Sequence, residues 1–269
     1  MSEAEVTTRS VVWMLLRRLL IIVLVIAVLL YLALAGLLYS KQRSLLYFPT
    51  RAAAVEAPSF SVTSNGLTLH GWAVNPGKPR ALLYFGGNGE AVERNADFFR
   101  STLPEITVYL IPYRGYSGNP GMPTEKDLYA DALIEFDRIR VDHAQVVVMG
   151  RSLGSGVATY VAAHRPVHRL VLVTPYDSIA KVAQGKYPLF PIGLLLKDKY
   201  ESWRRAPALA MPTLVLIAAK DRVIPRGNSD ALVASFTQRP EVVVVPEAGH
   251  NDISAQADYS SALEAFLAD

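Results

Sequence analysis

The sequence predicts an α/β fold in which a mostly parallel sheet carries helices on both faces and follows one N-terminal apolar helix. Three observations lead to this prediction. Short apolar runs alternate with helical periods from residue 81 to the C-terminus. Residues 19–38 form an apolar stretch without any charge. At residues 150–154 a serine between glycines follows directly on one of the apolar runs, as at a turn from a strand into a helix.

The composition of the 269 residues excludes several classes of protein. Without the apolar stretch, the chain has the size of one α/β domain rather than two. The formal net charge is +3 and like charges form no long block, so we expect no nucleic-acid partner. Cysteine is absent, which excludes disulfides, thiolate metal sites and a cysteine nucleophile.

The apolar stretch is long enough to span a bilayer as a helix, because its length at helical rise matches a hydrocarbon core of roughly 30 Å. A cleaved signal peptide is the alternative, since the small residues at 33–36 resemble a cleavage site. The apolar run is longer than that of a usual signal peptide. We therefore expect residues 1–40 to form a short tail and a single transmembrane anchor, with the lipid bilayer as its partner.

The orientation of this anchor rests on its flanking charges. Basic residues are equal in number on the two sides of the stretch, so the positive-inside rule does not decide the topology. The adjacent pair Arg17 and Arg18, after a short N-terminal tail, favours an N-terminus inside the cell. We expect a single-pass protein of the plasma membrane, with the rest of the chain on the non-cytoplasmic side.

Residues 41–58 mix bases, aromatics and prolines and are interpreted as a juxtamembrane connector. The apolar residues 45–48 within it are expected to pack on the following domain, and the alternative is that they dip into the membrane interface. That domain, residues 59–269, begins with alternating residues at 60–74 around Asn65-Gly66, a dipeptide that readily takes the positive φ angles of a tight hairpin. The sheet is therefore predicted to start with two antiparallel strands.

The rest of the domain alternates between strands and helices. The predicted strands are 81–87, 106–112, 145–150, 169–175, 212–219 and 241–246, and the predicted helices are 94–100, 124–139, 153–163, 228–236 and the C-terminus. Repeated strand-helix units imply right-handed crossovers, and a site in such a sheet lies at the carboxyl ends of the strands. Residues 178–209 interrupt the rhythm with prolines and an apolar patch, and we interpret them as a cap inserted over the site.

The candidate nucleophile is Ser152, in the pentapeptide Gly150-Arg151-Ser152-Leu153-Gly154. A serine at a sharp turn between strand and helix projects its Oγ above the sheet, and the flanking glycines avoid collisions with the neighbouring strand and helix. The helix N-terminus favours the negative charge that develops during attack. The alternative interpretation is a glycine-rich turn whose serine only caps the helix.

A serine hydroxyl needs a base to take its proton, and the chain has five histidines. Only His250 follows the last predicted strand, at the carboxyl edge where it can approach Ser152. The other four lie in the first hairpin or between helices and the strands that follow them, at His70, His143, His164 and His168. His250 is therefore the candidate general base.

The candidate acid that orients this histidine is Asp221, directly after the strand 212–219. With this choice, nucleophile, acid and base occur in the order Ser, Asp, His along the chain. Asp177 is a rival because it also follows a strand, and Asp252 is a weaker rival that is expected to cap the last loop. Chain position favours Asp221.

Acyl transfer also needs two backbone donors for a developing oxyanion. We expect one to be the N–H of Leu153 and the other the N–H of Asn88, in the loop 85–90 after a predicted strand. The Gly-Gly-Asn-Gly segment of this loop lacks the partners of a phosphate-binding fingerprint, and no ligand spacing typical of a metal site occurs. We therefore expect no cofactor and no metal.

Several motifs resemble those of a known superfamily. NGLTLHGW, YFGGNGE, GRSLGSGVA, TPYDSI, AAKDRVIP and AGHND, with LLYFP after the apolar stretch, are similar in order to the α/β-hydrolase superfamily. Within it they resemble the membrane-anchored branch that includes the bud-emergence protein of fission yeast and abhydrolase-domain depalmitoylases. The resemblance implies an α/β-hydrolase fold and a catalytic triad of Ser152, Asp221 and His250. One departure is Gly86, where relatives often carry a histidine.

The resemblance implies a serine hydrolase that cleaves an ester or thioester of a small or acylated molecule through an acyl-enzyme. The apolar cap residues favour an acyl chain, unless they only cover the core: Tyr187, Leu189, Phe190 and Trp203. The alternative from another class is a catalytically inactive membrane-bound scaffold with the same fold. Haloperoxidase or lyase chemistry would use the same triad. The oligomeric state is not predicted.

Overall fold

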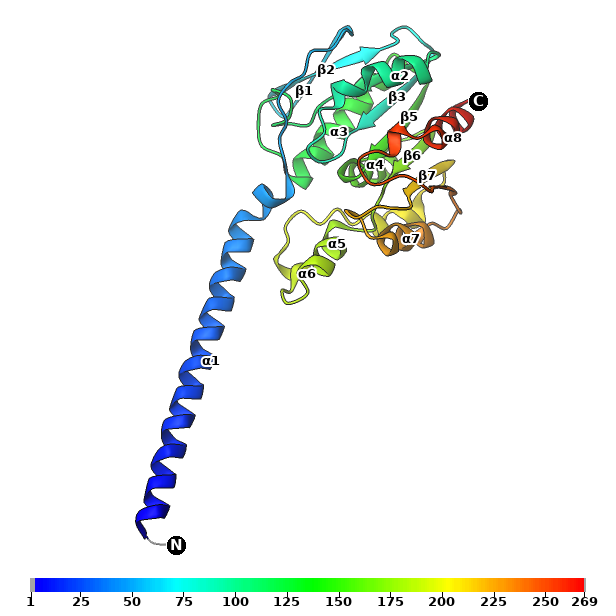
Figure 1. Cartoon of the computed structure of the whole chain (residues 1–269). Coiled ribbons are helices and arrows are strands. Elements are labelled where there is room, and N and C mark those ends of the chain that lie inside the picture. The colour runs from blue at the N-terminus through cyan, green and yellow to red at the C-terminus, as the bar shows by residue number, and fades with distance from the viewer. Residues whose placement is uncertain (1–2, 269) are drawn as a thin grey trace. The chain divides into compact units, whose positions relative to one another are not determined.

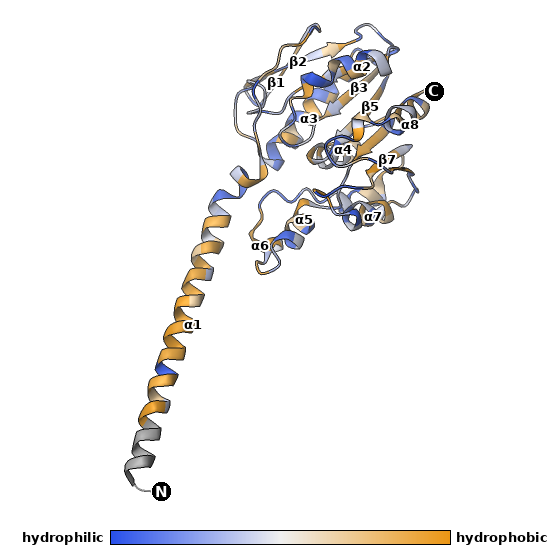
Figure 2. Cartoon of the chain, viewed as in Figure 1, coloured by the Kyte–Doolittle hydropathy of each residue, from blue (hydrophilic) through white to orange (hydrophobic). Residues whose placement is uncertain are grey.

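The computed structural model describes residues 3–268, with side chains from residue 11 onward, and divides into two compact units between Gln42 and Arg43. The first unit consists of most of helix α1 (Glu3–Leu46). Between Arg18 and Lys41 this helix carries no charged residue, and it is long and apolar enough to cross a membrane (Figure 2). Length and composition of this kind fit a membrane anchor and a signal sequence equally.

The second unit contains one sheet of eight strands in the order β1-β2-β4-β3-β5-β6-β7-β8 (Figure 1). Strands β1, β2 and β4 pair antiparallel, and every other pairing is parallel. The strands are β1 (Ser59–Ser64), β2 (Leu67–Val74), β3 (Arg80–Phe85), β4 (Ile106–Leu110), β5 (Gln145–Arg151), β6 (Arg169–Val173), β7 (Thr213–Ala218) and β8 (Glu241–Val245). The predicted mostly parallel sheet is confirmed.

Two hydrophobic cores lie on the two faces of this sheet, because successive strand residues point to opposite sides. In β3, Leu83 belongs to one core and Leu82 to the other. The first core takes residues from α3 (Glu125–Arg140), α4 (Leu153–His164) and α7 (Arg226–Ser235). The second takes residues from α2 (Ala96–Thr102) and α8 (Ala257–Leu267). The central strands are thus buried on both faces, as their continuous apolar runs predict.

The first hairpin turns at Asn65 and Gly66, whose φ angles are +48° and +79°. Positive φ at both central residues matches the twist of the flanking strands, so the predicted hairpin is confirmed. Two helix starts differ from the predictions. A 3₁₀ turn over Val92–Asn95 precedes α2, and α7 begins at Arg226, directly after Pro225, whose ring sets a φ compatible with entry into a helix.

Residues 178–209 contain α5 (Ile179–Lys186), α6 (Ile192–Leu195) and two short 3₁₀ turns, Ser202–Arg204 and Ala206–Ala208.

The connector, residues 41–58, contacts the domain at several points before the chain enters β1. Its Tyr47 is buried, and the Tyr47 hydroxyl lies 2.8 Å from that of Tyr200. The N–H of Ala53 donates to Glu93 Oε1 at 2.8 Å. The connector is therefore held by the domain at several points.

Candidate active site

Ser152 lies between the end of β5 and the start of α4, with φ +49° and ψ −116°. A non-glycine residue in this region is strained, and its surroundings must hold it there. The N–H of Ser152 donates to the carbonyl of Val173 in β6 at 2.9 Å. Its own carbonyl accepts from the N–H and the hydroxyl of Ser155 at 2.9 and 2.7 Å. These bonds to a neighbouring strand and to the first helical turn hold the strained serine in place.

The glycines of the pentapeptide are required by close approach. A Cβ on Gly154 would lie 2.1 Å from the carbonyl oxygen of Phe85, and one on Gly150 would lie 2.3 Å from the carbonyl oxygen of Gly154. Neither contact leaves room for a side chain, because backbone rather than a movable side chain stands in the way. α4 can therefore begin against β3 only with glycine at both positions.

The structure brings Ser152, His250 and Asp221 together from the ends of β5, β8 and β7. His250 Nε2 lies 2.9 Å from Ser152 Oγ, and His250 Nδ1 lies 2.7 Å from Asp221 Oδ2. An ionised carboxylate only accepts hydrogen bonds, so the ring proton is on Nδ1 and Nε2 is free to accept from the serine hydroxyl. The three side chains therefore form a continuous relay, and both Ser152 and His250 are only 9% exposed.

Asp221 is held as a carboxylate. Its Oδ1 accepts from the backbone N–H groups of Val223 at 2.8 Å and Ile224 at 2.9 Å. Burial alone would raise the pKa of Asp221, but the hydrogen bond from His250, the two backbone donors and the charge of the histidine outweigh it. The pKa of Asp221 is thus lowered from its ordinary value, so the group remains ionised at neutral pH.

The two rival carboxylates have other partners. Asp177 accepts from the N–H of Ser178 and the amide of Asn228, both at 2.8 Å, and pairs with Lys181. These bonds fasten the loop after β6. Asp252 accepts from the N–H of Gly249 at 2.6 Å within the last loop. Among the described residues, Asp221 is the carboxylate bonded to His250.

The loop after β3 presents one candidate oxyanion donor, the N–H of Asn88, and the first residue of α4 presents the other, the N–H of Leu153. The N–H of Gly87 is used by Glu90 Oε2 at 2.6 Å. In the described part of the chain, the N–H groups of Asn88 and Leu153 have no acceptor within the protein. The Asn88 side chain points to the connector instead, because its Nδ2 donates to the carbonyl of Leu46 and its Oδ1 accepts from the N–H of Phe48 at 2.9 Å.

Two charged residues that the sequence analysis did not single out connect these loops. Glu90 accepts from the hydroxyl of Tyr84 at 2.7 Å and forms an ion pair with Arg151 at 3.3 Å. Arg151 also donates to the carbonyls of His250 and Asn251, both at 3.2 Å. The guanidinium of Arg151 therefore connects the loop 85–90, which contains Asn88, with the loop of His250. The signal in the sequence that could have pointed to this link is the charge of Arg151, next to Ser152.

A cavity of about 440 Å³ opens beside the serine, and we call it the Ser152 cavity. It is lined by Phe48, Gly87, Asn88, Gly89, Glu90, Arg151, Ser152, Val223, His250 and Asn251. Its large apolar side chains are Phe48, from the connector, and Val223. None of these lining residues comes from 178–209, so in the described chain the segment interpreted as a cap does not form the wall of this cavity.

Gly86 has a physical explanation. A Cβ at this position would lie 2.3 Å from Cγ1 of Val92, so Val92 occupies the space that a larger residue would need. The carbonyl of Gly86 accepts from the hydroxyl of Tyr113 at 2.8 Å, which fixes the peptide ahead of Asn88. Packing and a buried hydrogen bond thus hold the peptide of Gly86.

Two of the remaining histidines bond to tyrosines away from the Ser152 cavity. The Nε2 of His143 lies 2.9 Å from the hydroxyl of Tyr109, and the Nδ1 of His164 lies 2.7 Å from the carbonyl of Tyr160. Burial lowers the pKa of His168. The described residues hold no group of three or more histidine or acidic side chains arranged for a metal ion.

Comparisons with known proteins identify relatives, although no family model matches the chain. An uncharacterized protein of Mycobacterium tuberculosis is 35% identical over 231 residues, which cover 80% of this chain and 82% of that protein. An α/β hydrolase domain-containing protein of Caenorhabditis elegans is 29% identical over 207 residues, which cover 75% of this chain and 56% of that protein.

Solved structures share the fold. An esterase from Pyrococcus furiosus has a TM-score of 0.67 at 16% identity, covering 82% of this chain and 98% of the esterase. A hydrolase from Pseudomonas aeruginosa has a TM-score of 0.63 at 19% identity, covering 78% and 98%. At such identities the likeness shows the fold alone, but it agrees with the named relatives and with the strand order. The chain therefore belongs to the α/β-hydrolase superfamily.

Proposed function

We propose that this protein is a membrane-anchored serine hydrolase that cleaves an ester or thioester through an acyl-enzyme at Ser152. The observation that carries the proposal is the relay from Ser152 Oγ through His250 to Asp221, beside a cavity at the carboxyl edge of the sheet. A nucleophile, a base within hydrogen-bond reach and a third group that orients the base are the requirements of nucleophilic acyl transfer.

In the first step, His250 Nε2 takes the hydroxyl proton of Ser152 while Oγ forms a bond to the carbonyl carbon of the substrate. The carbonyl oxygen becomes an oxyanion and accepts from the N–H groups of Leu153 and Asn88. Asp221 stabilises the imidazolium without taking its proton. When the intermediate collapses, the bond to the leaving oxygen or sulfur breaks, and the leaving group receives the proton from His250.

In the second step, a water molecule gives a proton to His250 and attacks the acyl-enzyme. The second oxyanion uses the same two donors, and its collapse breaks the bond to Ser152 Oγ. The proton on His250 returns to the serine, and the acid product leaves. Arg151 supports both steps as a positioning residue, since it ties the His250 loop to Glu90.

The membrane anchor and the acylated nature of the substrate rest on two further observations. The apolar helix from Val11 has its side chains exposed along a length that suits a bilayer. Phe48, two residues after the end of this helix at Leu46, lines the Ser152 cavity and is 55% exposed. An apolar wall this close in sequence to a bilayer segment favours an acyl chain delivered from the membrane.

Labelling with a fluorophosphonate probe tests the assignment. The full chain in detergent or nanodiscs should be labelled at one site, and labelling should disappear in Ser152→Ala. Labelling that survives this replacement would defeat the assignment of the nucleophile. A folded wild-type protein that resists the probe would favour a scaffold without turnover. Turnover of ester and thioester substrates of different acyl length then tests the substrate class.

A further inference from the structure

Residues 185–197, which we call the α5–α6 tip, expose two leucines to an unusual degree. Leu189 is 80% exposed and Leu194 is 86% exposed, while Tyr187 is 45% exposed. Single apolar side chains on a surface need no explanation, but several on one short segment indicate an interaction surface. The tip does not line the Ser152 cavity.

The tip presents these leucines on an ordered backbone. The amide of Gln184 donates to the carbonyl of Phe190 at 3.0 Å and accepts from the N–H of Ile192 at 3.1 Å. Phe190 and Ile192 are turned inward, with 9% and 8% exposed. Residues of the same segment next to the leucines are thus buried. The two hydrogen bonds of the Gln184 side chain fix the backbone, so Phe190 and Ile192 face the protein while Leu189 and Leu194 point outward.

The C-terminal end of the tip adjoins a residue that is paired with Arg43, the first residue of the second unit. Asp198 follows the tip, and its carboxylate accepts from the guanidinium of Arg43 at 2.9 and 3.3 Å. Arg43 comes five residues after the uncharged stretch 19–38. Leu194 is four residues from Asp198, a reach of at most about 14 Å. The exposed leucines are therefore tied to the part of the domain that is nearest in sequence to the proposed bilayer anchor.

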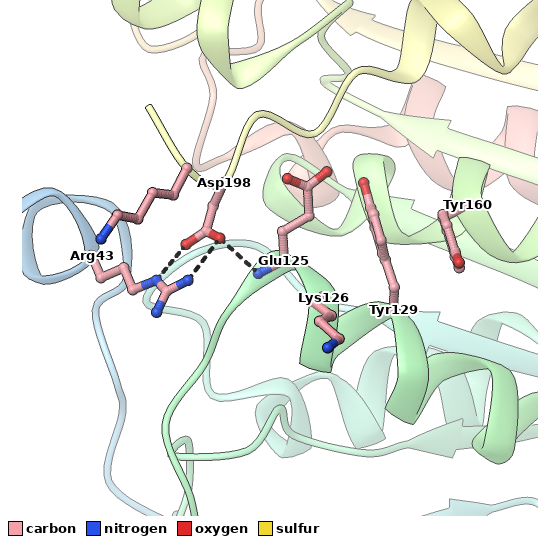
Figure 3. A pocket seen from close by; sticks show the side chains of 7 residues that line it. Arg43, Glu125, Lys126, Tyr129, Tyr160 and Asp198 are labelled. Atoms are coloured by element: carbon pink, nitrogen blue, oxygen red, sulfur yellow. Dashed lines mark hydrogen bonds and ion pairs between the residues drawn. The ribbon is translucent and has the colours of Figure 1, made fainter. Parts of the chain in front are cut away.

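Cations surround this attachment. A second cavity, of about 400 Å³, lies here, and we call it the Arg43 cavity (Figure 3). Its wall contains Arg43, Lys126 and Lys197. The cavity is also lined by Glu125, Tyr129, Tyr160 and Asp198. Both of its carboxylates accept hydrogen bonds from backbone N–H groups. Exposed Lys186 stands at the start of the tip, so apolar side chains are flanked by positive charge on both sides.

We propose that the α5–α6 tip is a second point of membrane attachment that docks on a bilayer containing anionic lipid. Leu189 and Leu194 enter the interfacial region, and the exposed Lys186 and Lys126 contact lipid phosphates. The inference rests on the membrane anchoring proposed above. A protein partner would also cover the leucines, but the link to the apolar stretch through Arg43 and the flanking cations favour lipid. Two attachments hold the domain in one orientation.

The absence of cysteine allows a direct test with single-cysteine variants of the full chain. Leu189→Cys, Leu194→Cys, Val141→Cys and Leu29→Cys are labelled with the same environment-sensitive fluorophore in nanodiscs of phosphatidylcholine and phosphatidylglycerol. Val141 is the matched control, because it is an apolar residue of similar exposure, 77%, at the end of α3. Leu29 lies in the apolar stretch and reports on the anchor.

Lipids that carry a spin label on the acyl chain should quench the dyes at 189 and 194 about threefold more than the dye at 141. This quenching should weaken when phosphatidylglycerol is omitted. The docking is overturned if the dyes at 189 and 194 are quenched no more than the dye at 141. If the dye at 29 is quenched in the same experiment, the anchor is left intact. Self-association that shields the tip without quenching also overturns the docking. An unquenched dye at 29 defeats the anchor, and with it the docking, whereas probe labelling of Ser152 reports on catalysis alone.

Discussion

The Ser152 cavity and the Arg43 cavity have similar volumes, about 440 and 400 Å³, but their polar groups are arranged differently. In the Ser152 cavity each side chain of the relay bonds to the next, and the relay ends on a hydroxyl that faces the cavity. In the Arg43 cavity both carboxylates accept from backbone N–H groups, and the carboxylate of Asp198 also accepts from Arg43. Cavity volume does not distinguish an active site from a charged hollow, whereas a relay ending on a nucleophile does.

The carboxyl groups of the two cavities also differ in their pKa values. The pKa of Asp221 is lowered because hydrogen bonds and the charge of His250 outweigh burial. The pKa of Glu125 is raised because burial outweighs the opposing hydrogen bonds, including those from the N–H groups of Lys199 and Tyr200. One carboxyl is stabilised in its charged form and the other is not, although both accept two backbone donors.

The largest effect should follow removal of the hydroxyl from the Ser152 cavity, with removal of a hydroxyl from the Arg43 cavity as the matched control. Ser152→Ala should lower kcat for a short soluble ester on the order of 10⁵-fold or more, because no other group can form the acyl-enzyme. Tyr160→Phe removes a hydroxyl from the Arg43 cavity and keeps the ring stacked on Tyr129, so kcat should stay near the wild-type value. Equal losses in both variants would contradict the contrast between the cavities.

Asp221→Asn should lower kcat/KM by about 10⁴-fold, because an amide no longer holds the histidine in the tautomer with its proton on Nδ1. The comparison is Asp177→Asn, which weakens the bonds to Ser178, Asn228 and Lys181. This variant should lose thermal stability but keep its turnover per folded molecule. Titration of active sites with the probe, combined with thermal unfolding, separates the two effects. Intact turnover in Asp221→Asn would reassign the acid.

Asn88→Ala keeps the backbone donor of the Ser152 cavity but removes its bonds to the connector at Leu46 and Phe48. We expect kcat to fall about 10- to 100-fold with a smaller change in KM, because the N–H is displaced from the position of the oxyanion. Ser117→Ala is the control, since its hydroxyl contacts the connector at Thr50, away from the cavity. A loss confined to KM would argue against a positioning role.

The smallest effect concerns stability and pH. The folded state keeps the proton of Glu125 to a higher pH than the unfolded chain, whose carboxyl has the ordinary pKa of 4.5. The folded protein therefore binds more protons in that window, and this group makes stability fall as pH rises. Glu125→Gln should remove this decrease.

Denaturant unfolding of the wild type and of Glu125→Gln between pH 4 and 7 measures this contribution of Glu125 to stability. The difference in the free energy of unfolding should move in favour of the variant as pH rises. Asp221 has the opposite sign, since its lowered pKa gives stability that is lost as pH falls below its ordinary value of 3.8. Removal of its charge in Asp221→Asn should therefore flatten the acid side of the stability profile. A pH dependence unchanged in Glu125→Gln would show that its proton is released at the same pH in both states.

Much of the fold could be predicted from the sequence, because local residue patterns determine where its strands and turns form. Apolar runs long enough for a buried strand predicted the parallel sheet, and Asn65-Gly66 predicted the hairpin. The pentapeptide around Ser152 predicted the turn between β5 and α4. The helix starts near residues 94 and 228 were less accurate, since a 3₁₀ turn and Pro225 shift the boundary by a few residues without changing the pattern.

Side-chain contacts across long stretches of sequence were not accessible in this way. The N–H of Phe48 is held by Asn88 and by the hydroxyl of Tyr116, and nothing near Phe48 in sequence indicates that it lines the Ser152 cavity. Arg151 connects Glu90 with the His250 loop, residues 61 and 99 positions away. The segment 178–209 was interpreted as a cap from its apolar residues, but its leucines face outward at the tip rather than toward the serine.

The sequence by itself determined the order of strands and helices, the apolar stretch and the candidate residues Ser152, Asp221 and His250. These depend on hydrophobic periodicity and on steric limits of the backbone, which act over a few residues. The tertiary structure alone decided where the side chain of Asn88 turns, how Arg151 links Glu90 to the His250 loop and which side chains of the tip are exposed. Those outcomes depend on how distant loops pack and satisfy their hydrogen bonds, and only the folded chain brings the partners within reach.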